Sequence, residues 1–380
     1  MADAGTEFVF TPEQQDLRRA VRQFCAERLD EDTVRRLMES ETGYDPALWT
    51  RLGGELGVLG LAVPEELGGA GGGLVDQAVV AEEFGAALVP GPVFGTVGLA
   101  VPALVALAGA GVEEGLLASL VEGTRTAAFA VPDRGGRFDP ALVTVTESGG
   151  TLTGEVSQVV DGTADVLLVA ARTGDGVGLF LVDEAERVPL STLDRTRRQA
   201  TVRFAATPAR ALASGAEAER AITTALRTGA ALLAAEQVGG AQRMLERTVA
   251  YAGTRLQFGR PIGSFQAVKH RCADMLVLVE HARSTAYHAV WALQDGTDDP
   301  DLAIGIAQAT CSEAYQRVAG DTVQLHGGIG FTWEHSAHLY FKRAVTDAAL
   351  LGSAAEHRER IAELVLDRAV AVGVPAVATG

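Results

Sequence analysis

RLQFGRPIGSFQ, residues 255–266, separates two long segments whose apolar residues recur at helical spacing. Arg255 is expected to end the first helix, because Gly259 and Pro261 interrupt the chain soon after it. Gln266 then opens the second helix. A guanidinium, a carboxamide and the N–H groups of a helix start would thus meet in one place, and this donor set suits a diphosphate. An arginine that only caps a helix C-terminus explains the same residues, and the stretch alone does not decide between the two interpretations.

QLHGGIGF, residues 324–331, is a second segment with ligand-binding character. Gly327 and Gly328 allow a ligand to approach the backbone closely, and Gln324 can form hydrogen bonds with an amide or an adenine edge. Glycine clusters more often mark turns, so this segment is a weak signal when it is taken alone.

VPEELGG, residues 63–69, predicts a bend between two helices, and Glu82 and Glu83 lie on the second of these helices. Carboxylates are rarely buried in proteins. We therefore expect both side chains on a solvated helix face.

The whole chain divides into three regions and predicts an α+β fold. Helix-start signals at Thr11–Gln14 and Asp45–Pro46 predict an N-terminal helical domain over residues 1–122. Short β-branched runs, divided by turns, predict a small antiparallel, barrel-like β domain over residues 123–213. A C-terminal helical bundle is expected over residues 214–380. Its four long helices are expected at residues 221–251, 265–293, 302–325 and 336–350.

Composition narrows the class of protein. The 380-residue chain has a formal net charge of −17, which disfavours nucleic acid as a partner. Three widely spaced cysteines argue against a disulfide framework and a zinc site, and His335 and His338 lack further ligands nearby, so we expect no metal. The start lacks a signal-peptide pattern, and the apolar run over residues 93–110 is broken by glycine and proline. We therefore expect a cytoplasmic protein without a membrane span.

Together and in this order, the three segments resemble the acyl-CoA dehydrogenase family. Its members carry a Val-Pro-Glu-Glu-x-Gly-Gly turn, an Arg-x-x-Phe-Gly-x-Pro-Ile-x-x-Phe-Gln segment and a Gln-x-x-Gly-Gly segment, and the resemblance covers essentially the whole chain. It implies a helical domain, a β-barrel-like domain and a C-terminal four-helix bundle. It also implies FAD as cofactor, an acyl-CoA substrate and an electron-transfer flavoprotein as a partner. The cofactor-binding residues that it implies are Arg255, Gln257, Phe258, Phe265, Gln266, Gln324, His326, Gly327 and Gly328.

The resemblance also implies a catalytic glutamate, which this chain lacks at both family positions. Leu351 stands on the turn where most members carry the glutamate, and Gly229 stands at the position that a second branch uses. Glu236 lies about two turns beyond Gly229, and Glu356 lies in the segment after Leu351; these two residues are the candidates for a displaced base. We therefore assign no catalytic residue.

The β region departs from the family pattern as well. In FAVPDRGGRFDP, residues 129–140, Ala130 and Gly136 replace a threonine and a serine of the stretch that wraps the flavin and thioester. In GEVSQVVDG, Gln158 and Val160 stand where members have a tryptophan and a threonine against the flavin ring. An aromatic platform and hydroxyl donors are thus missing together.

In the family, the segments that this chain keeps act on the FAD of a neighbouring subunit. We therefore predict a non-catalytic subunit of a heteromeric FAD-dependent acyl-CoA dehydrogenase, in which FAD is shared across the interface with a homologous subunit in an α2β2 complex. The sequence resembles the steroid-CoA branch of such enzymes. A homo-oligomeric flavoenzyme with a displaced base or oxygenase chemistry is one alternative. A flavin-free acyl-binding or scaffold protein is another.

Overall fold

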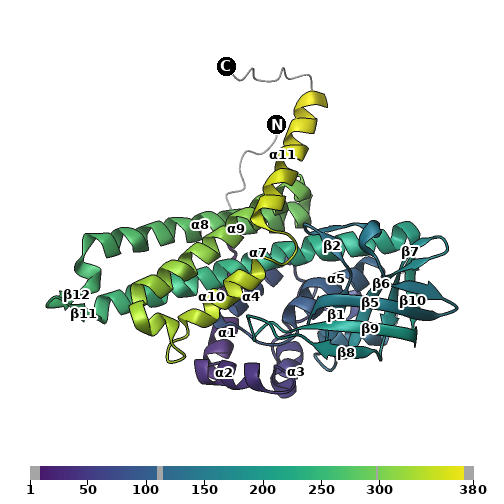
Figure 1. The fold of residues 1–380 in the computed structure, drawn as a ribbon, viewed down its shortest axis with the longest axis horizontal. Coiled ribbons are helices and arrows are strands. Elements are labelled where there is room, and N and C mark those ends of the chain that lie inside the picture. The colour runs from purple at the N-terminus through teal and green to yellow at the C-terminus, as the bar shows by residue number, and fades with distance from the viewer. Residues whose placement is uncertain (1–8, 109–113, 297, 372–380) are drawn as a thin grey trace.

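A computed structural model describes residues 9–108, 114–296 and 298–371 of the chain. Helices come first, a sheet follows and long helices complete the fold, which is the order that the sequence predicts. Figure 1 shows the sheet at one end of an elongated molecule, with the long helices running from it toward the opposite end. The first helices lie below these long helices in the same view.

The N-terminal region begins its helices where the sequence signals them. Thr11 and Gln14 form a capping box at the first helix, and Asp45 caps the third helix ahead of Pro46. A π-helical segment, η2 (Phe94–Ala100), precedes the fifth helix. The α-helices of this region are α1 (Pro12–Arg28), α2 (Glu31–Glu39), α3 (Pro46–Gly54), α4 (Leu74–Ala87), α5 (Val101–Ala106) and α6 (Glu114–Val121).

The carboxylates on α4 are buried, so the expectation of a solvated face is wrong. Glu82 and Glu83 are 3% and 4% exposed. Arg22 donates two hydrogen bonds to Glu83, of 2.9 and 2.8 Å, while Arg18 and the Tyr287 hydroxyl reach Glu82 at 2.9 and 2.6 Å. Burial of these carboxylates is sustained by cations from α1 and by a hydroxyl from the C-terminal helices.

The β region forms one eight-stranded sheet with the order β10-β7-β6-β4-β5-β9-β8, and β1 pairs with β6. The prediction of an antiparallel domain is wrong in two places, because β1 and β4 both run parallel to β6. All four residues of β1 are buried, as is usual for parallel strands. The strands of the sheet are β1 (Ala127–Ala130), β4 (Thr146–Ser148), β5 (Thr151–Val160), β6 (Val166–Thr173), β7 (Gly176–Val182), β8 (Glu186–Pro189), β9 (Gln199–Pro208) and β10 (Arg210–Ser214). A separate two-stranded hairpin contains β2 (Asp133–Arg134) and β3 (Arg137–Phe138).

The C-terminal region contains the four long helices that the periodicity predicts. These helices are α7 (Gly215–Thr254), α8 (Gln266–Asp295), α9 (Pro300–His326) and α10 (Ala337–Asp347), and α11 (Ala354–Ala371) follows them. A short hairpin of β11 (Leu256–Gln257) and β12 (Arg260–Pro261) joins α7 to α8 at the tip farthest from the sheet (Figure 1). Among the described helices, none combines the length and the apolar character that crossing a membrane requires.

Candidate functional site

A cavity of about 880 Å³ lies where the sheet faces α7 and α10. Gln158 and Val160 of β5 line one side of it, and Leu226 of α7 contributes to another. Thr346 near the end of α10 and Leu351 on the following turn complete this part of the wall. The structure therefore brings together the turn and the strand that depart from the family pattern, although about 190 residues separate them in sequence.

The turn at Leu351 is held by backbone contacts. Leu351 has a φ of 53° and Gly352 a φ of 99°, so both lie in the left-handed region. His357 Nε2 donates a 2.9 Å hydrogen bond to the Leu351 carbonyl. A Cβ on Gly352 would lie 2.7 Å from Gly135 Cα, so glycine is required for the approach to the β2–β3 hairpin. The turn presents a buried leucine, 7% exposed, at the position where the family resemblance leads us to expect a glutamate.

The polar side chains on the cavity wall include carboxyls and carboxamides, and the described residues that line the cavity include no lysine or arginine. Asp133 is one of these carboxyls, and the backbone N–H of Gly136 donates to it at 2.7 Å. Burial raises the pKa of Asp133, this hydrogen bond opposes the rise, and the charge of Glu356 adds to it. Asp133 is not among the residues expected from the sequence; its position directly after Pro132 in the altered segment is the signal that could have identified it.

Neither acidic residue considered as a displaced base lines the cavity. Glu236 is buried in ion pairs with Arg197 and Arg343. Burial would raise the pKa of Glu236, but the two guanidiniums outweigh it and lower this pKa. Glu356 caps its own helix, accepting 2.8 Å hydrogen bonds from the backbone N–H and hydroxyl of Ser353, and these bonds lower its pKa. Both carboxylates already have structural partners.

The residues expected to bind the diphosphate half of a cofactor gather at the tip of the α7–α8 hairpin. Arg255 is the residue that ends α7, and its side chain is exposed, as are those of Gln257 and Gln266. Phe258 is 92% exposed with a φ of 52°, and its ring meets Phe265 edge-on at 6.1 Å. An aromatic ring held in solvent beside unused donors is typical of a surface that meets a ligand or another chain.

The glycine segment lies at the same end of the bundle. Gln324 is exposed on the last turn of α9, and Gly327, with a φ of 63°, and Gly328 follow it on the surface. His326 differs, because it is 4% exposed and stacks on Tyr251 of α7 at 4.3 Å. Its imidazole is therefore engaged inside the chain rather than presented beside the glutamine and the glycines.

The cavity and the tip are far apart within one chain. Leu226 lines the cavity, and Arg255 ends the same helix 29 residues later. At about 1.5 Å per residue, the helix separates them by about 43 Å. Figure 1 shows the β11–β12 hairpin and the sheet at opposite ends of the molecule. One extended dinucleotide cannot reach both places in a single chain.

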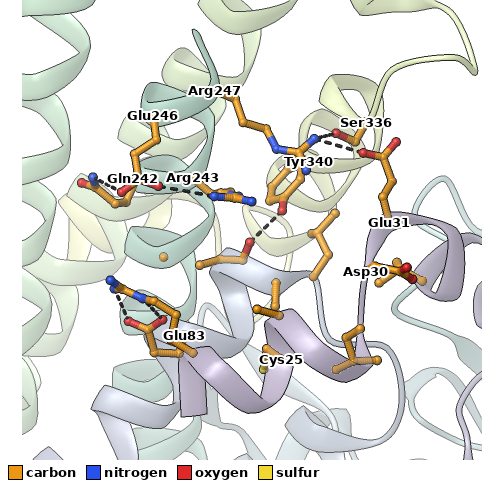
Figure 2. Close-up of a pocket in the computed structure, with 18 of the residues that line it drawn as sticks. Cys25, Asp30, Glu31, Glu83, Gln242, Arg243, Glu246, Arg247, Ser336 and Tyr340 are labelled. Atoms are coloured by element: carbon orange, nitrogen blue, oxygen red, sulfur yellow. Dashed lines mark hydrogen bonds and ion pairs between the residues drawn. The ribbon is translucent and has the colours of Figure 1, made fainter. Parts of the chain in front are cut away.

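A second cavity, of about 590 Å³, lies between the first helices and α7 and α10 (Figure 2). Six of the eight charged residues on its wall are paired with one another, while Asp30 caps α2 and Glu82 pairs with arginines outside the wall. Arg22 pairs with Glu83, and Arg247 pairs with Glu31 and donates to Ser336. The wall therefore offers ion pairs that are already formed, and none of the residues expected to bind cofactor lies on it.

The helix–sheet–helix order and the cavity between sheet and bundle define the class of protein, and the family models agree with them. The acyl-CoA dehydrogenase N-terminal domain matches residues 11–124, and the acyl-CoA dehydrogenase C-terminal domain matches residues 219–366. The chain belongs to the acyl-CoA dehydrogenase family, whose members are oxidoreductases acting on CH–CH bonds.

Three similar proteins illustrate the family, and one of them is named as a steroid enzyme. Acyl-CoA dehydrogenase IpdE2 of Mycolicibacterium smegmatis is 40% identical over 349 residues, which cover 92% of this chain and 97% of the relative. The ChsE4–ChsE5 complex of Mycobacterium tuberculosis contains a chain that is 31% identical, with a TM-score of 0.84, covering 98% of this chain and 100% of that one. A variant of the Tcur3481–Tcur3483 steroid ACAD is 33% identical, with a TM-score of 0.82, covering 94% and 99%.

Proposed function

We propose that the chain is the subunit without a catalytic base in a heteromeric, FAD-dependent acyl-CoA dehydrogenase. Its homologous partner would carry the glutamate, and two copies of each would form an α2β2 complex in the cytoplasm. A CoA thioester with a steroid-derived acyl group is the substrate class that we propose, because one similar structure is described as a steroid ACAD. The ChsE4–ChsE5 structure, which is titled as a complex, supports the heteromeric assembly. The observation that carries the proposal is Leu351 on the cavity turn.

The reaction needs a group that accepts the α-proton from about 3 Å away. A leucine side chain has no lone pair, and the left-handed turn at Leu351 places this side chain in the cavity wall. Glu236 and Glu356 are held by structural partners elsewhere. The chain's own cavity therefore lacks the proton acceptor at the family position.

The residues present fit FAD at the tip better than in the chain's own cavity. FAD is a dianion at its diphosphate, and it supplies the hydride acceptor when it is bound. The described cavity lining offers carboxyls and no cation to such a group. At the tip, Arg255, Gln257 and Gln266 expose donors, and a helix N-terminus lies beside them. Arg255, Gln324 and their neighbours would thus hold the diphosphate and adenosine half of a cofactor whose ring lies in the partner.

Flavin content tests this arrangement. The full chain alone should retain little flavin, whereas co-expression with a homologous glutamate-bearing subunit should give a complex with flavin on one of each pair of chains. Arg255→Ala in the complex should weaken FAD retention by about 2 kcal/mol, or roughly thirtyfold, through the loss of a charge-assisted contact. The control is Arg220→Ala at the exposed start of the same helix. Stoichiometric FAD and dehydrogenase activity in the chain alone would contradict the proposal.

Asp133 favours a second candidate function, that of a homo-oligomeric flavoenzyme, which is active without a second kind of subunit. Its carboxyl lines the cavity, and burial raises its pKa, which is the direction that makes a carboxylate a stronger base. In that case Asp133→Asn would abolish activity of the isolated chain while leaving flavin binding unchanged. Under the first proposal the isolated chain has no activity for this substitution to remove.

A further inference from the structure

A buried group of charged side chains links the three regions of the chain through ion pairs and hydrogen bonds behind the cavity. Arg343 of α10 binds Asp194 from the β8–β9 connection and Glu236 of α7. Arg197, which lies just before β9, binds the same Glu236 carboxylate. Asp161 at the end of β5 accepts a 2.8 Å hydrogen bond from the backbone of η2 in the N-terminal region. We refer to Asp161, Asp194, Arg197, Glu236, Arg343 and Asp347 as the charge cluster.

The charge cluster has more acids than bases. Four carboxyls face two guanidiniums, so full ionisation would leave an excess of two negative charges inside the protein. Burial raises the pKa of Asp347 to about 7 and that of Asp161 to about 6. Tyr315 of α9 lies near the cluster, and burial raises its pKa as well.

Arg197 and Asp347 face each other with unused hydrogen-bonding atoms. Asp347 is fully buried, and neither of its carboxyl oxygens has a hydrogen-bond partner in the described structure. Nε and Nη1 of Arg197 lack partners as well, and Nε lies 3.4 Å from Asp347 Oδ1. Meanwhile Nη2 of Arg197 is bonded to Glu236. The guanidinium thus has a second anionic position within a short rotation, and a full charge on Asp347 would draw the guanidinium there.

The same guanidinium touches the cavity wall. Its central carbon lies 5.0 Å from the ring centre of Phe94, in a cation–π contact. Phe94 belongs to η2 and lines the large cavity. Thr346, next to Asp347 in sequence, lines the cavity from α10. A change in the position of Arg197 therefore alters the support of an aromatic wall residue.

We propose that Arg197 is a proton-controlled latch, which holds Glu236 and braces Phe94 while Asp347 is protonated, and which turns toward Asp347 when that carboxyl ionises. Two discrete arrangements of one buried guanidinium are what a switch requires. The latch makes the shape of the cavity wall depend on pH near neutrality, whatever ligand the cavity receives.

Fluorine NMR of the full chain, labelled with fluorophenylalanine, tests the latch. Phe94→Leu identifies the Phe94 resonance by its loss. In the otherwise unsubstituted protein, this resonance should shift with a midpoint of about pH 7. In Asp347→Asn it should stay at its low-pH position throughout, because the amide mimics the protonated acid. Asp301→Asn is the matched control, since Asp301 also lies between two arginines but outside the charge cluster.

A second variant covers the case in which Asp347→Asn fails to fold. Arg197→Lys keeps a positive charge but offers no fork of donors, so the Phe94 resonance should lose most of its pH-dependent shift. A Phe94 resonance that does not move across the neutral range would overturn the latch. So would a resonance that titrates in Asp347→Asn or in Arg197→Lys as it does without the substitution.

Discussion

Leu351→Glu introduces a carboxyl at the position that we propose for the family glutamate, and we expect it to weaken the chain without producing a dehydrogenase. Leu351 is 7% exposed and belongs to the main hydrophobic cluster. Replacing the leucine removes about 2 kcal/mol of apolar burial at any pH. The introduced carboxyl then lies in an apolar wall, where burial raises its pKa.

The sign of the pH dependence follows from that rise. A carboxyl whose pKa is raised in the folded state binds protons more tightly there than in the unfolded chain. Below about pH 4 the carboxyl is protonated in both states, so its ionisation does not lower the free energy of unfolding there. Each unit of rise costs about 1.4 kcal/mol once the pH exceeds the folded value. For a rise of about two units, the total loss of unfolding free energy should grow from about 2 kcal/mol in acid to about 5 kcal/mol near pH 8.

Urea unfolding of the full chain at several pH values measures this loss, with Leu351→Gln as the uncharged control of similar shape. The control should lose about 2 kcal/mol at every pH. Flavin absorbance and acyl-CoA-dependent dye reduction, measured on the same samples, should stay at the level of the unsubstituted chain. Turnover in Leu351→Glu alone, or a stability loss that does not vary with pH, would refute the reasoning.

Two further predictions use the close packing of the bundle. A Cβ on Gly239 would lie 1.7 Å from the carbonyl oxygen of Glu82, so Gly239→Ala should lower the free energy of unfolding by at least about 3 kcal/mol. A Cβ on Gly253 of the same helix would meet nothing within 4 Å, so Gly253→Ala should change this free energy by less than about 1 kcal/mol. Equal effects of the two substitutions in urea unfolding would contradict the geometry. A thiol reagent such as DTNB should modify only Cys272 in the native protein. Cys25 and Cys311 are buried, and burial raises the pKa of both thiols to about 12. Rapid reaction of a second thiol before denaturation would show that the core opens.

Local signals in the sequence are sufficient to predict the helix starts and the break between α7 and α8. A capping threonine or aspartate ahead of proline fixes a helix start through atoms within four residues, and both α1 and α3 begin where these signals lie. The break between α7 and α8 follows from Gly259 and Pro261, which cannot both continue a helix. The residues that determine these helix boundaries are close together in the chain, so the boundaries can be predicted from the sequence.

The buried charges could not be found in this way. Glu82 and Glu83 look like a solvated pair, because the arginines that neutralise them lie on α1 and α8. The partners in the charge cluster are also distant, since Arg343 meets Asp194 across 149 positions of the chain. The parallel pairing of β1 with β6 has the same origin in long-range packing. The spacing of residues in the sequence does not indicate which distant residues will form such contacts.

The turn at Leu351 has an unusual backbone conformation whose causes do not depend on a catalytic side chain. A left-handed conformation costs a leucine about 1–2 kcal/mol, and a side chain alone gives no reason to adopt it. Here the conformation is imposed by the hydrogen bond from His357 and by the close approach of Gly352 to Gly135. The hydrogen bond lies within the C-terminal region, whereas the approach of Gly352 joins the turn to the β2–β3 hairpin, and both contacts exist whether or not a base is present. The geometry that would aim a glutamate is therefore structural, and the proton chemistry of the proposed complex depends on one side chain, which this chain does not supply.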